Sequence, residues 1–180
     1  MLRARMFGRQ RDSSHGIDSA VIVRRLVKTD ARVIGLLPGV DRAAAALSVL
    51  LMEWAATMAD FVAGPIGVVA DWSTWNGSAG GAAVADEERP RLVSLVPPPC
   101  PDAGTATPAL MEAVSKHRGA FSRILVNLSR YAAPGRVPTA AEVVDGVAII
   151  IPTGRMRRGP LKNLVQDLDA RKNLGAILID

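Results

Sequence analysis

The sequence predicts a single domain of the α/β class, built on a doubly wound and mostly parallel sheet. Short continuous apolar runs alternate with segments of helical periodicity, which is the order that βαβ units require. Hydrophobic residues make up 49% of the 180-residue chain, but aromatic residues only 4%. The core must therefore consist of Ala, Val, Ile and Leu, as in a sheet that helices cover on both faces. A chain of this length suits one domain with a sizeable core.

The first half of the chain contains one βαβ unit. Residues 17–29 have apolar positions at near-helical spacing and predict a short helix, and the apolar run 33–37 predicts a buried strand. Residues 42–62 are apolar almost all round, which is typical of a helix that packs on a sheet and is itself covered. Gly64 is expected to end this helix. The run 66–70 then predicts a second strand, parallel to the first.

The second half continues the alternation. Residues 72–90 are glycine-rich and predict an irregular connection, and a proline-rich loop is expected as far as Pro108. Gly175 is expected to cap the last helix. The remaining elements are expected, in chain order, as a strand at 92–96, a helix at 109–118, a strand at 124–128, a helical turn at 139–144, a strand at 146–151, a helix at 160–172 and a strand at 176–179.

The net charge of +5 is concentrated at the N-terminus. Residues 1–32 hold eight basic and three acidic side chains, and the basic and acidic residues of the rest of the chain balance. We therefore expect a flexible basic arm at 1–16 and a globular domain at 17–180. Such an arm could remain a solvated tail or could contact an anionic membrane surface. Nucleic acid is not an expected partner, because few aromatic side chains are available for base stacking.

The composition also indicates a reducing compartment. Cys100 is the one cysteine, so no disulfide framework or cysteine-based zinc cluster can form. The first residues lack the apolar segment of a signal peptide. The most apolar helix is interrupted by Glu53 and Asp60, which favours a buried helix over a membrane span. We expect a cytoplasmic protein.

Segment 33–44 has the outline of a phosphate-binding loop without its chemistry. An apolar strand leads through a Pro38-Gly39 turn into a long helix. A working loop of the form G-x-x-x-x-G-K-[ST] uses glycines to let backbone N–H groups surround phosphates, a lysine to reach the terminal phosphate and a hydroxyl to hold Mg²⁺. Here Asp41 stands in place of the second glycine, Arg42 in place of the lysine and Ala43 in place of the hydroxyl residue.

The ordered set of segments resembles the MinD/ParA-like P-loop proteins and, within them, the cytoplasmic tyrosine kinase domain of bacterial capsular and exopolysaccharide synthesis. The resemblance covers most of 17–180. It rests on R-V-I-G-L-L-P-G-V-D-R-A-A-A-A-L-S for the first strand, loop and helix, and on G-V-V-A-D for the second acidic motif. F-S-R-I-L-V-N-L-S resembles the strand that ends in the Walker B residue, and D-G-V-A-I-I-I-P-T-G-R resembles a closing strand. The resemblance implies a P-loop NTPase-like fold.

The departures from that family are equally informative. Asn127, a neutral amide, stands at the Walker B position, where the family has a carboxylate near the metal. Asp71 is retained, but Val69 replaces a second aspartate. The family's C-terminal tyrosine cluster has no counterpart, since Tyr131 is the one tyrosine. The degenerate nucleotide-site positions are thus Gly39, Asp41, Arg42, Asp71 and Asn127.

These departures predict a protein that has kept the fold and lost phosphoryl transfer. Mg²⁺ and lysine supply most of the transition-state stabilisation in such enzymes. We expect no catalytic residue, metal or bound cofactor, although an arginine fork at Arg42 could still hold ATP or ADP without turnover.

The resemblance implies a non-enzymatic partner or regulator in exopolysaccharide synthesis or export. The expected partner is a membrane polysaccharide co-polymerase or another subunit of the synthesis complex, which would bring the protein to the inner membrane. Self-association is a further expectation, because relatives form dimers or rings. Two alternatives stay open: a divergent ATPase or kinase that uses Arg42 and Asp71, and a positioning protein of the MinD/ParA kind.

Overall fold

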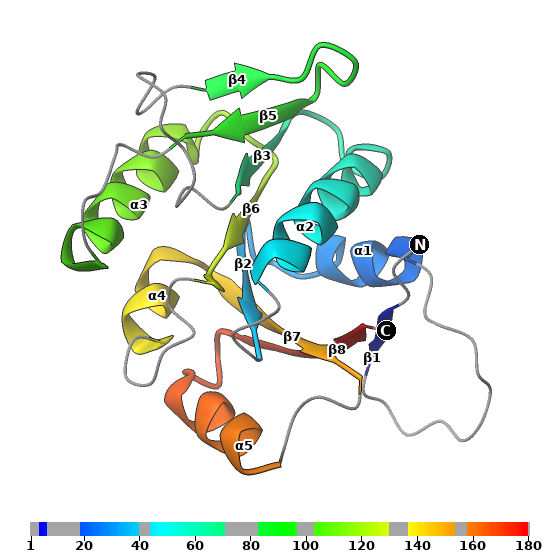
Figure 1. Cartoon of the computed structure of the whole chain (residues 1–180). Helices are drawn as coiled ribbons and strands as arrows, with labels where there is room; N and C mark the ends of the chain where they lie inside the picture. The colour runs from blue at the N-terminus through cyan, green and yellow to red at the C-terminus, as the bar shows by residue number, and fades with distance from the viewer. Residues whose placement is uncertain are drawn as a thin grey trace.

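One sheet organises the domain. The computed structural model describes residues 4–6, 19–39, 44–70, 83–96, 103–129, 137–153 and 158–179. In these ranges eight strands form a single sheet in the order β1-β8-β7-β2-β6-β3-β5-β4 (Figure 1). The strands are β1 (Ala4–Met6), β2 (Val33–Pro38), β3 (Ile66–Val69), β4 (Ala83–Ala85), β5 (Leu92–Leu95), β6 (Arg123–Asn127), β7 (Gly146–Pro152) and β8 (Asn173–Ile179). The helices are α1 (Ser19–Val27), α2 (Ala44–Ala59), α3 (Ala103–His117), α4 (Val137–Val143) and α5 (Arg158–Asp167).

The inner strands are parallel and the edge strands are antiparallel. β2 lies at the centre, between β6 and β7, and pairs with both in parallel. β3 and β5 extend the parallel sheet beyond β6, and β8 extends it beyond β7. β1 and β4 pair antiparallel with β8 and β5 and form the two edges. The predicted doubly wound, mostly parallel α/β fold in a single domain is confirmed.

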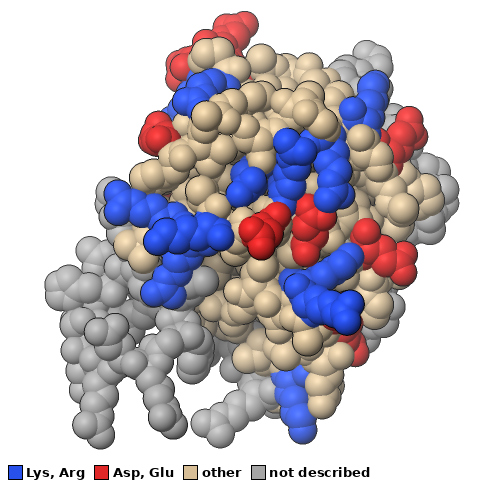
Figure 2. All heavy atoms as spheres, turned by 180° about the vertical axis from the view of Figure 1, so that it is seen from behind, with Lys and Arg blue, Asp and Glu red and all other residues tan. Residues whose placement is uncertain are grey.

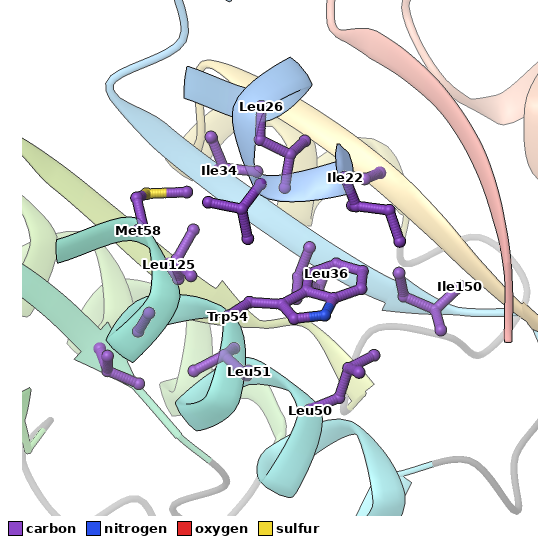
Figure 3. Packing of buried hydrophobic residues seen from close by; sticks show 14 of the residues in the cluster. Ile22, Leu26, Ile34, Leu36, Leu50, Leu51, Trp54, Met58, Leu125 and Ile150 are labelled. Atoms are coloured by element: carbon purple, nitrogen blue, oxygen red, sulfur yellow. The ribbon is translucent and has the colours of Figure 1, made fainter. Parts of the chain in front are cut away.

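Helices cover both faces of the sheet and give it two cores. α1 and α2 lie on one face, and α3, α4 and α5 on the other (Figure 1). Alternate residues of β2 point to opposite faces, as the strand period of two requires. Ile34 and Leu36 join the core under α1 and α2, whereas Val33 and Leu37 join the core on the other side. In the first of these cores Trp54 of α2 lies among side chains of α1, β2 and β7 (Figure 3).

The structure corrects several of the predicted boundaries. α3 begins at Ala103, so Pro108 stands inside a helix and does not close a loop. α5 ends at Asp167, earlier than expected. Gly175 belongs to β8 and caps no helix: it has a φ of +101°, at a register shift where Val147 pairs with Asn173 and Ala148 with Gly175. The glycine therefore allows a β-bulge, a role in which a positive φ is common.

Two strands were not predicted. β4 lies within the stretch expected to be irregular, where Ala83, Val84 and Ala85 pair with β5. β1 lies within the segment expected as an arm, and its three residues pair with the end of β8. Three-residue strands carry too few alternating positions to be recognised from sequence. No helix in the described ranges is both long enough and apolar enough to cross a membrane.

Candidate functional site

The connections of β2 and β6 place a switch point at the centre of the sheet. β2 leads into α2 on one face, and β6 leads towards α4 on the other (Figure 1). Adjacent parallel strands whose helices leave in opposite directions open a crevice at their carboxyl ends, where α/β proteins bind ligands. Leu36 of β2 is in register with Asn127 of β6. The structure therefore brings Gly39 and Asn127, two of the predicted site positions, to the same edge.

Gly39 follows the last residue of β2 and is half-buried. Its backbone N–H donates a hydrogen bond to the carbonyl of Ile150 on β7, across 2.8 Å. A phosphate-binding loop needs N–H groups that point freely at the ligand. The N–H of Gly39 is instead part of the sheet's hydrogen bonding. Asp41, Arg42 and Asp71, the other three predicted positions, lie outside the described residues.

Asn127 is the buried polar residue of the described part of the chain, with 2% of its surface exposed. Its Nδ2 donates to Oγ of Ser48 in α2, at 3.0 Å. Its Oδ1 accepts a hydrogen bond from the backbone N–H of Ser129, at 2.9 Å. Both polar ends of the amide are thus bonded within the protein, as buried polar groups require.

Ser48 is the residue of this site that the sequence analysis did not single out. It lies in the second turn of α2, between Leu47 and the pair Leu50 and Leu51, which are fully buried. The available signal was a small hydroxyl side chain in a helix that is otherwise apolar almost all round. A polar residue in such a helix needs a partner, and the structure supplies Asn127 as that partner.

The donor set at Asn127 does not suit Mg²⁺. Magnesium in nucleotide sites is held by carboxylates together with hydroxyl and phosphate oxygens. Asn127 offers a neutral amide whose oxygen already accepts from Ser129 and whose nitrogen faces Ser48. Within the described ranges, no three His, Cys, Asp or Glu side chains lie close enough together to hold a metal ion.

The sheet order and the central switch point define a doubly wound α/β domain with a mostly parallel sheet. Two solved structures have this fold. The VpsO kinase domain superimposes with a TM-score of 0.65 at 18% sequence identity, over 89% of this chain and 93% of that one. The BceF tyrosine kinase domain gives a TM-score of 0.64 at 11% identity, over 89% of this chain and 73% of that one. No protein-family model and no curated protein sequence matches the chain.

The comparisons bear out the resemblance to tyrosine kinase domains at the level of the fold. At identities of 18% and 11%, the two comparisons establish the fold and not the chemistry of any single position. The chemistry of the candidate site is therefore inferred from the hydrogen bonds of Gly39 and Asn127.

Proposed function

We propose that this protein is a catalytically degenerate relative of the tyrosine kinases of exopolysaccharide synthesis. It acts as a non-enzymatic partner or regulator of the machinery that makes or exports the polysaccharide at the inner membrane. The kinase-like fold supplies the scaffold, and the carboxyl edge of the sheet serves as a binding surface and not as a site of phosphoryl transfer.

The hydrogen bonding of Asn127 is the observation that supports this proposal best. Phosphoryl transfer depends on a metal ion held in place next to the transferred group. Asn127 has an amide where the kinase family has a carboxylate, and this amide is hydrogen-bonded to Ser48 and Ser129. Arg42 and Ala43 replace the lysine and hydroxyl residues of the loop, so three contributions to transition-state stabilisation are lost from one site.

The proposed partner is the cytoplasmic segment of a membrane polysaccharide co-polymerase or another subunit of the synthesis complex. The protein would dock through the carboxyl edge of the sheet or the flanking helices, with the basic residues of 1–16 close to the anionic membrane surface. Self-association through the same scaffold is part of the proposal.

Calorimetric titration with Mg-ATP and Mg-ADP, followed by a turnover assay, tests the loss of catalysis. We expect no hydrolysis and no transfer to tyrosine, whether or not nucleotide binds. Hydrolysis that disappears in Asp71→Ala would overturn the proposal in favour of a divergent ATPase. Binding without turnover supports a pseudoenzyme that uses Arg42 as a phosphate fork.

A capture experiment tests the partner. The full chain is mixed with the purified cytoplasmic segment of the co-polymerase, and separately with anionic vesicles and with duplex DNA. We expect stable capture by the co-polymerase segment. Binding to vesicles or DNA with no affinity for that segment would contradict the proposal and favour a positioning protein of the MinD/ParA kind.

A further inference from the structure

A cavity of about 470 Å³ lies at the amino edge of the sheet, opposite Gly39 and Asn127. It forms where several helix-to-strand connections converge, and its volume is in the range of small-molecule sites. The α1–β2 connection contributes four residues, the connections that follow α3, α4 and α5 contribute one residue each, and β8 contributes Leu174. The lining residues are Thr29, Asp30, Ala31, Arg32, Arg118, Asp145, Arg171 and Leu174.

Asp145 fixes the geometry of this cavity. Its Oδ2 accepts hydrogen bonds from the backbone N–H groups of Arg32 and Val33, at 3.0 and 2.9 Å. Its Oδ1 forms an ion pair with Arg118. Partial burial favours the protonated carboxyl, but the N–H of Val33, the Arg118 guanidinium and the N–H of Arg32 together outweigh it and lower the pKa of Asp145. The negative charge of Asp145 is therefore already compensated within the protein.

Two further guanidinium groups line the same cavity. The side chains of Arg32 and Arg171 are exposed and make no hydrogen bond or ion pair with any described residue. Asp30, also exposed, is the one other charged residue among the described residues of the lining. The face of the molecule turned away from the view of Figure 1 carries Lys and Arg side chains gathered around acidic ones (Figure 2).

Among the described lining residues the positive charge comes from arginine and not from lysine. Its planar fork donates two parallel hydrogen bonds and matches the oxygens of a phosphate or carboxylate. Once Arg118 is paired with Asp145, Arg32 and Arg171 leave two positive charges against the single carboxylate of Asp30. A phosphate monoester carries between one and two negative charges at pH 7, and Asp30 can accept hydrogen bonds from hydroxyl groups next to it.

We propose that this cavity binds a phosphate monoester, carried by a small ligand or by a lipid headgroup, through Arg32 and Arg171. The phosphate lies between the two guanidinium groups, and Asp145 holds Arg118 and the start of β2 in place around it. The site is separate from the carboxyl edge, so it can be present whether or not that edge binds nucleotide.

The test is a calorimetric titration of the full chain with inorganic phosphate, with glucose 1-phosphate and with phosphatidylcholine vesicles that contain phosphatidic acid. The first two probes represent a free ligand, and the vesicles represent a lipid headgroup. We expect saturable binding of at least one probe, weakened about tenfold or more in the double variant Arg32→Ala with Arg171→Ala. Arg32→Ala keeps the backbone N–H that Asp145 accepts, so both variants should fold, as thermal unfolding will verify.

A matched control variant distinguishes a specific binding site from nonspecific electrostatic attraction to a basic surface. Arg89→Ala with Lys162→Ala removes the same two charges from exposed positions outside this cavity, and it should leave binding within about twofold. An equal loss in both double variants would show diffuse electrostatics and overturn the proposal. So would the absence of saturation by every probe up to about 10 mM, which corresponds to an affinity too weak for a built site. Loss of vesicle binding alone in the Arg32 and Arg171 variant would identify the ligand as a lipid headgroup.

Discussion

The side chains of Asn127 and Ser48 join the end of β6 to helix α2 by a hydrogen bond of 3.0 Å between Nδ2 and Oγ. The two residues are 79 positions apart in the chain. The bond lies at the carboxyl edge of the sheet, the edge at which β2 ends before Gly39. The bond links α2 to the sheet, and the proposed function rests on both polar ends of the Asn127 side chain being bonded within the protein.

The first prediction concerns the strength of this bond. Asn127→Ala should lower the free energy of unfolding by about 1–3 kcal/mol, because the Ser129 N–H and the Ser48 hydroxyl lose a buried partner. Ser48→Ala should lower it by about 1 kcal/mol or somewhat more. Urea unfolding of both single variants and the double variant measures the coupling, which we expect to be about 0.5–1.5 kcal/mol. Strictly additive effects would show that the two side chains do not interact.

The second prediction is a pH dependence at Asp145. Its pKa in the folded protein is lower than its ordinary value of 3.8, so the carboxylate stabilises the fold above that pH and loses this effect as the pH falls further. Asp145→Ala should cost about 1–3 kcal/mol at pH 7, because it removes the acceptor for the N–H groups of Arg32 and Val33. The difference between wild type and variant should shrink below pH 3.8. Asp167→Asn, which removes a carboxylate from an exposed position of α5, serves as the control.

Most of the fold was predictable because buried parallel strands leave a strong local signal. The runs that became β2, β3 and β7 are continuous and apolar, since both faces of each strand are covered. The predictions that were wrong concern features that depend on contacts between residues far apart in the chain. Gly175 reads as a helix cap in the sequence, and only its pairing with Ala148 reveals a bulge. β4 exists because β5 offers it an edge.

The candidate site was predictable only in part. The position of Asn127 at a strand's carboxyl end follows from the apolar run before it, so its place near Gly39 could be foreseen. Its partner could not, because the contact with Ser48 depends on how α2 rotates on the sheet. The cavity at the opposite edge gave no sequence signal at all, since Arg32, Arg118 and Arg171 come from three separate connections.

A third prediction concerns Trp54, which is fully buried and packs with Ile22, Leu36 and Ile150 (Figure 3). Trp54→Ala should cost about 3–5 kcal/mol through the cavity it leaves. Trp54→Phe should cost far less, under about 1.5 kcal/mol, because the phenyl ring keeps most of the apolar contact. The substitution also removes the indole Nε1–H, which has no hydrogen-bond partner among the described residues. Denaturant unfolding of both variants measures the two costs. Equal losses would indicate that the indole N–H is bonded after all.

The last prediction concerns the close approach of β2 and the residue that follows Asn127. A Cβ at Gly35 would overlap Cδ1 of Leu128 and come within 3.3 Å of Cγ2 of Val144. Leu128 is fully buried, so it cannot move away freely, and Gly35→Ala should lower stability by about 1–3 kcal/mol. Adding Leu128→Ala should make the Gly35 substitution nearly neutral relative to Leu128→Ala alone, as thermal unfolding of the set will measure. Gly119→Ala is the matched control: apart from its chain neighbours, no described residue has an atom within 4 Å of the Cβ position, so the stability of this variant should change by less than about 1 kcal/mol.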